Sequence, residues 1–273
     1  MLKTISGLLL LLTLLPGPLL AGPQYASEET QQVIEKMLEA HGGLERWQSA
    51  PSIRYDAVMH NNYHGKNEFA WWVQHEVIDQ QTRQVYQDWT LDGARLGYDG
   101  NEVWTQNWNR SNPPTMMVHF FYYFVNLPWL TQDDGVILGE PQTFTWPEIN
   151  KELIEVSMTF SEAPGPGKTA KDYFVLYINP DNWRLFGYQY GIGYQRFLDL
   201  VNMPEGQKIF GPLWRVITKY SEVDGLVFPA AFRTMPEPDA RIVGNHVILN
   251  IDVSQPFDQN KAKRPVGGIT DRE

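Results

Sequence analysis

Histidine and carboxylate side chains are the first candidates for chemistry, because the sequence contains no cysteine and thiol catalysis and cysteine-bound metals are therefore excluded. His60 and His64 are spaced like two metal ligands on one face of a helix, and Glu68 and His75 follow. The intervening Asn61-Asn62-Tyr63-His64-Gly65 is typical of a hairpin turn, in which the two rings need not share a face. We therefore expect no metal site here.

Four short motifs resemble catalytic or phosphate-binding sequences, and each departs from its pattern. The pair Asp133-Asp134 has too few neighbouring ligands for a calcium or glycosidase site, and we expect solvated loop charge. The stretch 162–169 ends in Gly-Lys-Thr but has Glu162 where a phosphate-binding loop needs glycine. Gly191-Ile192-Gly193 lacks the third glycine of a dinucleotide site. His41-Gly42-Gly43 could form an oxyanion loop, but no Gly-x-Ser-x-Gly elbow accompanies it. The sequence predicts no catalytic residue, no metal and no cofactor.

Aromatic residues are abundant, with 10 Trp, 13 Tyr and 13 Phe in 273 residues. Adjacent Trp71 and Trp72 lie in a strand-like run and must point to opposite faces of a sheet. Rings and methionines crowded together make either an oversized core or the lining of an apolar pocket. The candidate ligand-binding residues are Trp71, Trp72, Trp89, Trp104, Met116, Met117, Phe120, Phe121, Tyr123, Phe124 and Trp129.

The charge balance argues against a nucleic-acid partner. The chain has 32 acidic and 22 basic residues, a formal net charge of -10, and no basic run. Hydrophobic residues make up 42% of the chain and charged residues 20%. This composition is typical of a globular protein with a sizeable core.

The first 21 residues have the layout of a secretory signal peptide. Lys3 precedes an apolar stretch from Ile5 to Leu15, and Pro16-Gly17-Pro18 and a small residue, Ala21, follow. We expect cleavage after Ala21, with Ala26 as the second option, and a periplasmic location, which a chain without cysteine suits.

Beyond the leader, one helix is expected before a long series of strands. Ser27 is a suitable N-cap, apolar residues recur at helical spacing up to Leu38, and His41-Gly42-Gly43 ends the helix. A second, aromatic helix is expected from Met116, stopped by Asn126 and Pro128, and a short one over 194–201. The expected strands are 53–59, 67–78, 84–91, 95–98, 102–107, 136–138, 153–160, 173–178, 183–190, 214–222, 226–233 and 246–253.

Consecutive hairpins without a linker favour a single α+β domain with a large curved antiparallel sheet. Asp92-Gly93, Asp99-Gly100 and Asp224-Gly225 join extended runs, as hairpin turns do. We place this domain at residues 22–257 and a flexible, charged tail at 258–273.

Several motifs resemble the outer-membrane lipoprotein-sorting (LolA/LolB-like) superfamily. They are Glu39-Ala40-His41-Gly42-Gly43-Leu44-Glu45-Arg46-Trp47, Leu96-Gly97-Tyr98-Asp99-Gly100-Asn101-Glu102-Val103-Trp104, Tyr177-Ile178-Asn179-Pro180-Asp181 with Trp183-Arg184-Leu185, and Asp224-Gly225-Leu226-Val227-Phe228-Pro229. The resemblance implies an unclosed β-barrel wrapped over helices, with a cavity that shelters acyl chains. It also implies a lipid or lipoprotein acyl chain as ligand, and envelope transport proteins as further candidate partners. No arginine here can be matched to the one that locks the family's lid.

The leading hypothesis is a non-enzymatic periplasmic carrier that holds an acyl chain between the sheet and the aromatic helix. Two alternatives remain open. One is an exported hydrolase that uses His60, His64, His75 or Asp99, and the other is a structural envelope protein whose rings only fill a core.

Overall fold

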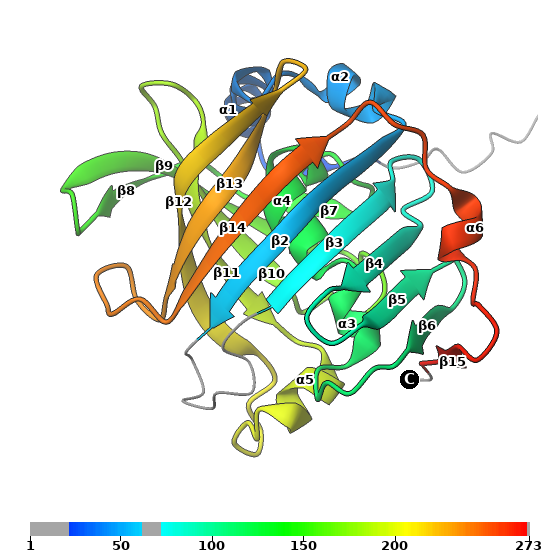
Figure 1. Ribbon diagram of the computed structural model, residues 1–273. Coiled ribbons are helices and arrows are strands. Elements are labelled where there is room, and N and C mark those ends of the chain that lie inside the picture. Colours follow the sequence, from blue (N-terminus) through cyan, green and yellow to red (C-terminus); the bar gives the residue numbers. More distant parts are fainter. Residues whose placement is uncertain (1–21, 62–71, 272–273) are drawn as a thin grey trace, which may run out of the picture.

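A single curved sheet dominates the computed structural model, which describes residues 22–61 and 72–271 (Figure 1). Its fifteen strands follow the order β1-β7-β9-β10-β11-β12-β13-β14-β2-β3-β4-β5-β6-β15, with β8 paired to β9. The pairings are antiparallel except for β1 with β7, so the sheet is mixed. It curves around helix α4 without closing (Figure 1). The predicted fold class, an α+β unclosed barrel wrapped over helices, is confirmed.

The elements have the following bounds. The strands are β1 (Gln24–Tyr25), β2 (Ser52–Asn61), β3 (Trp72–Asp79), β4 (Val85–Trp89), β5 (Ala94–Tyr98), β6 (Val103–Gln106), β7 (Val136–Leu138), β8 (Gln142–Trp146), β9 (Lys151–Phe160), β10 (Tyr173–Ile178), β11 (Leu185–Ile192), β12 (Phe210–Val223), β13 (Leu226–Met235), β14 (Gly244–Asp252) and β15 (Ile269–Thr270). The helices are α1 (Glu28–Ala40), α2 (Leu44–Ser49), α3 (Pro114–Met117), α4 (Phe120–Leu130), α5 (Gln195–Leu200) and α6 (Gln259–Ala262).

Helix α1 begins and ends where the sequence predicts. The Ser27 side chain accepts a hydrogen bond from the Thr30 amide at the N-terminus. At the C-terminus, Gly42 has a φ of 97°, and a Cβ there would lie 2.2 Å from the Gly225 carbonyl oxygen. The motif therefore ends a helix and packs it against the β12–β13 turn.

The aromatic segment forms two helices, α3 and α4, and extends further than predicted. Asn126 was expected to stop the helix, but its side chain accepts from Trp47 Nε1 and donates to the Tyr122 carbonyl. These bonds engage the side chain, which would otherwise favour a non-helical conformation by hydrogen-bonding to the nearby backbone. Pro128 lies in the last turn, and α4 continues to Leu130.

The predicted strands are present, and three short ones were not predicted. β1 and β15 have two residues each, too few for a periodic pattern, and β8 folds back on β9. Part of the expected strand 67–78, residues 67–71, lies outside the described residues, as does the expected signal peptide. No described helix is both long enough and apolar enough to span a membrane.

The prediction of a loose C-terminal tail was wrong for residues 258–271. β15 pairs with β6, and Asp271 forms an ion pair with Arg196 and accepts from the Thr115 amide and hydroxyl. The carbonyl of Ala262, in α6, accepts from Trp104 Nε1. Charged residues such as Asp271, which suggested a solvated tail, instead bond this segment to the rest of the fold.

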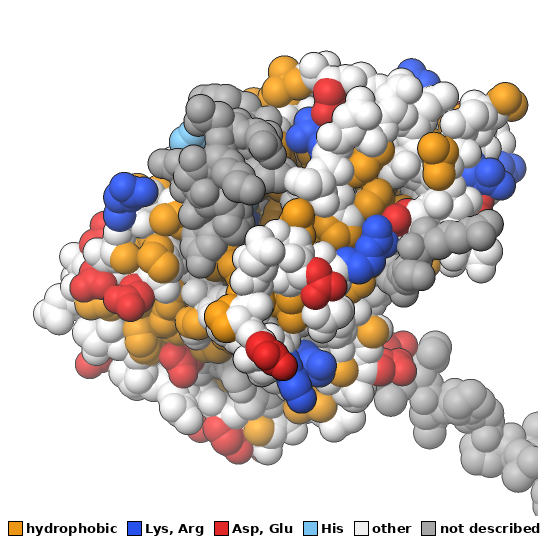
Figure 2. Space-filling model, turned by 90° about the horizontal axis from the view of Figure 1, so that it is seen from below, with side chains coloured by type: hydrophobic (Ala, Val, Ile, Leu, Met, Phe, Trp, Pro, Cys, Tyr) orange, Lys and Arg blue, Asp and Glu red, His pale blue; other side chains and the backbone are white. Residues whose placement is uncertain are grey.

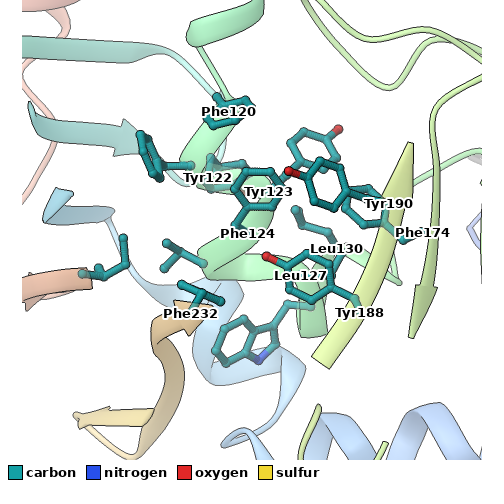
Figure 3. Packing of buried hydrophobic residues seen from close by; sticks show 14 of the residues in the cluster. Phe120, Tyr122, Tyr123, Phe124, Leu127, Leu130, Phe174, Tyr188, Tyr190 and Phe232 are labelled. Atoms are coloured by element: carbon teal, nitrogen blue, oxygen red, sulfur yellow. The ribbon is translucent and has the colours of Figure 1, made fainter. Parts of the chain in front are cut away.

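The core lies mainly on the concave face of the sheet. Rings of α4, including Tyr123 and Phe124, face Phe174, Tyr188 and Tyr190 from β10 and β11 (Figure 3). A second, smaller cluster lies apart from it and consists of Trp146, Leu153, Tyr177, Val216 and Met235. Alternation along β12 separates the two, because Ile217 belongs to the first cluster and Val216 to the second.

Candidate ligand cavity

A cavity of about 280 Å³ lies at the end of the concave face where α5 is found (Figure 1). Helices α3, α4 and α5 and the ends of β2, β3 and β11–β14 surround it. Figure 2 views the molecule from this end and shows hydrophobic side chains reaching the surface between polar ones. The lining residues are Met59, Trp72, Ser111, Asn112, Met116, Phe120, Tyr190, Ile192, Phe197, Leu200, Val201, Asn202, Phe210, Leu213, Arg215, Thr234, Val243, Gly244 and His246.

The side chains that line this cavity are exposed at one end and buried at the other. Ser111 and Asn202 are exposed and form the rim. Most of the walls are buried apolar side chains such as Phe210 and Leu213. Arg215 is 1% exposed and forms the buried end. The cavity thus leads from the surface, past apolar and polar side chains, to a buried cation.

Three of the predicted ligand-binding residues line this cavity. They are Trp72 from β3, Met116 from α3 and Phe120 from α4. The rings of Trp72 and Phe120 meet edge to face, with centroids 6.3 Å apart. Strand and helix thus contribute to one wall.

The other predicted residues on the concave side lie behind or beside the cavity. Phe120, Tyr123 and Phe124 line a neighbouring pocket of about 20 Å³, which is too small for an acyl chain. Trp89 packs against Trp72, outside the lining. Met117 and Phe121 are fully buried in the main core.

Two tryptophans lie elsewhere, and one cannot be placed. Trp129 stacks on Trp47 at the opposite end of α4, with ring centroids 5.8 Å apart. Trp104 lies across Gly97 and donates to the Ala262 carbonyl of α6, outside both core clusters. Trp71 is outside the described residues.

Arg215 lines this cavity and is not among the residues predicted from the sequence. Its guanidinium lies over the Phe124 ring, 3.6 Å from the centroid. The nearest polar side chains, the Tyr188 hydroxyl and His246 Nε2, are both at 3.5 Å, and Nε has no partner. No Asp or Glu of the described ranges forms an ion pair with Arg215.

Two further polar groups lie at the same end. His246 is 2% exposed, and burial together with the neighbouring Arg215 holds its pKa well below the usual value. The ring is therefore neutral at physiological pH, with Nε2 toward the guanidinium. His246 Nδ1 and Thr234 Oγ1 lack hydrogen-bond partners among the described residues. The buried end thus offers one positive charge and unused hydrogen-bonding groups.

A buried polar row connects the sheet with the helices beside the cavity. Glu76 on β3 lies opposite Gln87 on β4, and Gln87 donates to the carbonyls of Met117 and Val118 between α3 and α4. Burial raises the pKa of Glu76 to about 8, so this carboxyl is protonated at neutral pH. This row fixes the position of the helices that form the cavity wall.

In the described part of the chain, two residues of the hydrolase alternative have separate partners. His75 pairs with Asp56, and Asp99 accepts from the amides of its own turn. His60 lies at the end of β2, beside Asn245, and His64 is outside the described residues. Over the described ranges, no cluster of three or more His, Asp or Glu could hold a metal.

Three other motifs serve the fold. His41 donates from Nδ1 to the Val227 carbonyl and accepts the Leu185 amide at Nε2, and burial lowers its pKa to about 4. Gly193 donates its amide to Asp172, and Gly167 packs directly against Met116.

The expectation of solvated charge at Asp133 was wrong. Asp133 pairs with Arg83 at 2.9 Å, and both side chains are less than a third exposed. The folded chain brings together residues 50 positions apart, which neighbouring sequence could not reveal.

The cavity residues that were missed had weak sequence signals. One strand contains Phe210, Leu213 and Arg215, and their spacing in the sequence does not show that they line a pocket. Arg215 resembles any other arginine in a strand. The expected helix over 194–201 is α5, but the sequence did not show that Phe197 and Leu200 line the cavity.

Comparison with solved structures shows which proteins share this fold. A DUF1329 family protein from Desulfovibrio piger superposes with a TM-score of 0.53 at 9% identity, covering 87% of this chain and 98% of that one. A LolA superfamily protein from Nitrosomonas europaea superposes with a TM-score of 0.51 at 8% identity, covering 87% of this chain and 99% of that one. The fold is that of the LolA superfamily. No protein-family model matches the chain, and no curated protein matches it in sequence.

The likeness confirms the resemblance noted in the sequence at the level of fold. At identities this low, shared fold carries no ligand with it. The function must therefore be argued from the cavity.

Proposed function

We propose that this protein is an exported carrier of the cell envelope that holds a single acyl chain in the cavity beside α5. The observation that carries the proposal is the cavity of about 280 Å³, whose apolar lining includes Trp72, Met116 and Phe120. The purely structural alternative expects rings without such a space. The leader-like residues 1–21 support export.

The size and lining of the cavity suit one chain. Ordinary ligand pockets range from about 300 to 1,000 Å³, so this one is near the lower limit and has little room for several chains. Each buried methylene contributes about 0.8 kcal/mol, which makes the aromatic and aliphatic part of the lining an effective binding surface. Methionine adapts to chains of different shape, because its side chain is flexible and polarisable.

The chain's charge fits a carrier that leaves membranes readily. A formal net charge of -10 disfavours lasting contact with anionic lipid surfaces, which repel it. The protein would then interact with a membrane only through the cavity that binds the acyl chain.

The first test is mass spectrometry of organic extracts from protein purified from its native envelope. It is combined with binding of N-phenyl-1-naphthylamine, a neutral apolar fluorescent probe. We expect a co-purified lipid with an acyl chain and a saturable fluorescence increase. Recovery of no lipid together with no probe binding would overturn the proposal.

A pair of variants tests whether the probe occupies this cavity. Leu213→Trp adds a ring inside the passage, and Leu249→Trp adds the same ring on β14, where Leu249 is 47% exposed. We expect Leu213→Trp to weaken probe binding at least about tenfold, a change of 1.4 kcal/mol, and Leu249→Trp to leave it unchanged. Equal binding by both variants would locate the probe elsewhere and contradict the proposed site.

A further inference from the structure

The buried end of the cavity combines features that ordinary cores avoid. An arginine removed from water loses several kcal/mol of hydration free energy, and proteins normally compensate with a buried carboxylate. Arg215 is 1% exposed, and no described acidic residue pairs with it. Its side chain lines the cavity. A ligand can therefore supply the missing opposite charge.

We propose that Arg215 binds the carboxylate of a fatty acid whose hydrocarbon chain extends along the apolar walls toward the rim. This inference rests on the proposed function and names the chemical class of its ligand. It differs from a lipoprotein acyl chain, which ends in a methyl group and carries no anion at its tip.

The geometry of Arg215 suits a carboxylate. A guanidinium has five N–H donors in a fixed plane, and a carboxylate can accept two of them side by side. The contacts to Tyr188 and His246 are long, at 3.5 Å, and Nε is unused. Stacking on Phe124 at 3.6 Å fixes the plane of the guanidinium before any ligand arrives.

The charge at this end favours a monoanion. Arg215 supplies one positive charge, and His246 beside it is neutral because burial and Arg215 disfavour its protonation. Lys168 approaches the rings of Phe120 and Tyr123 and lines only the small neighbouring pocket. A carboxylate balances one charge, whereas a phosphate group near its second ionisation would bring excess negative charge into a buried site.

The order of residues gives the ligand its direction. Along β12, Arg215 is followed toward α5 by Leu213 and Phe210, both of which line the cavity. Ile192 and Phe197 add apolar surface on the same side, before the exposed Asn202 at the rim. A chain anchored by its carboxylate at Arg215 therefore meets these apolar side chains on the way out.

The test compares laurate with 1-dodecanol, which has the same chain without the charge. Each displaces N-phenyl-1-naphthylamine from the full-length protein at pH 7.5. We expect laurate to bind at least about tenfold more tightly than dodecanol, the equivalent of 1.4 kcal/mol. Equal affinities would overturn the anion site and leave the proposed function standing. Failure of both ligands to displace the probe would contradict both.

Two arginine variants assign the preference to one side chain. Arg215→Met keeps an unbranched, flexible apolar side chain and removes the charge. Arg233→Met makes the same change on β13, where Arg233 pairs with Glu148 away from the cavity. We expect Arg215→Met to abolish the preference for laurate while dodecanol affinity stays within about threefold, and Arg233→Met to retain it. Equal loss of both ligands in Arg215→Met would indicate a structural role and overturn the inference.

A third ligand tests the head group in the wild-type protein and does not depend on the folding of any variant. Dodecyl phosphate has the same chain with a larger and more highly charged oxyanion. We expect it to bind more weakly than laurate. Tighter binding of dodecyl phosphate would overturn the assignment to a fatty acid.

Discussion

The two ends of the concave face use the same kinds of side chain in opposite ways. At the end near α1 and α2, Trp129 stacks on Trp47, and the Trp129 indole donates to the Gly43 carbonyl. Trp47 donates to Asn126, and both nitrogens of His41 are bonded. At the end near α5, rings surround a space instead, and polar atoms at its buried side lack partners among the described residues.

This difference shows that the number of aromatic residues does not locate a binding site. Both ends are rich in rings, and both are largely buried. What separates them is the empty space and the buried Arg215 beside it, which forms no ion pair with an acidic residue of the described ranges. A buried arginine without a carboxylate is therefore a stronger indication of a ligand than any of the tryptophans.

Removing one tryptophan at each end should give the largest contrast in stability. Trp129→Ala leaves a hole in a closed core and should lower the free energy of unfolding by about 3–5 kcal/mol. Trp72→Ala enlarges an existing cavity and should cost about 2 kcal/mol less, while it weakens probe binding. Urea unfolding measured on both variants checks this. Equal costs, with probe binding unaffected by Trp72→Ala, would contradict the distinction between the two ends.

The polar row between the ends should make stability depend on pH through Glu76. Its pKa is about 8 in the folded chain against an ordinary value of 4.5, so between these values the unfolded chain ionises while the folded chain keeps its proton. The free energy of unfolding therefore falls as pH rises through this window, by up to about 1.4 kcal/mol per pH unit.

The Glu76→Gln variant isolates this contribution. It cannot ionise, so its stability relative to wild type should increase from pH 5 to pH 8. Urea unfolding at several pH values measures the difference between the two proteins. A difference that stays constant with pH would show that the carboxyl titrates normally.

Two glycines with left-handed backbone conformation allow the packing at each end of the concave face to be tested separately. Gly42 and Gly206 both have positive φ, but a Cβ on Gly42 would strike the Gly225 carbonyl, whereas nothing lies within 4 Å of one on Gly206. Gly206→Ala should cost about 1 kcal/mol for its backbone conformation alone. Gly42→Ala should cost at least about 2 kcal/mol, since the clash adds to it. Thermal unfolding of the two variants gives the comparison, and similar shifts would argue against close packing at α1.

The sequence predicted the parts of this molecule that local interactions determine. Ser27 and Gly42 mark the ends of α1 because capping depends on a few neighbouring residues, and Asp224-Gly225 forms the expected hairpin turn. Asn126 was misjudged because its partner, Trp47, is 79 positions away. The same limit applies to Asp133 with Arg83.

The candidate site was only partly predictable for a related reason. Trp72, Met116 and Phe120 could be proposed because their side chains are conspicuous, and they do line the cavity. Trp104 is just as conspicuous in the sequence. Its ring, however, lies on another part of the sheet, where it packs on Gly97 and donates a hydrogen bond to α6. Arg215 could not be recognised, since the absence of a carboxylate beside it is a property of the folded chain.

A tryptophan added on alternate faces of β12 should distinguish empty space from packed core. Leu213→Trp places the ring in the cavity, where there is room, and should change the free energy of unfolding by less than about 1 kcal/mol. Val216→Trp places it in the cluster of Trp146, Tyr177 and Met235, and should cost about 1–3 kcal/mol through overpacking. The two positions lie three residues apart on one strand, so local strand propensity cannot account for a difference. If urea unfolding showed Leu213→Trp to be the costlier change, the passage would be too narrow for an acyl chain, and the carrier function would lose its structural basis.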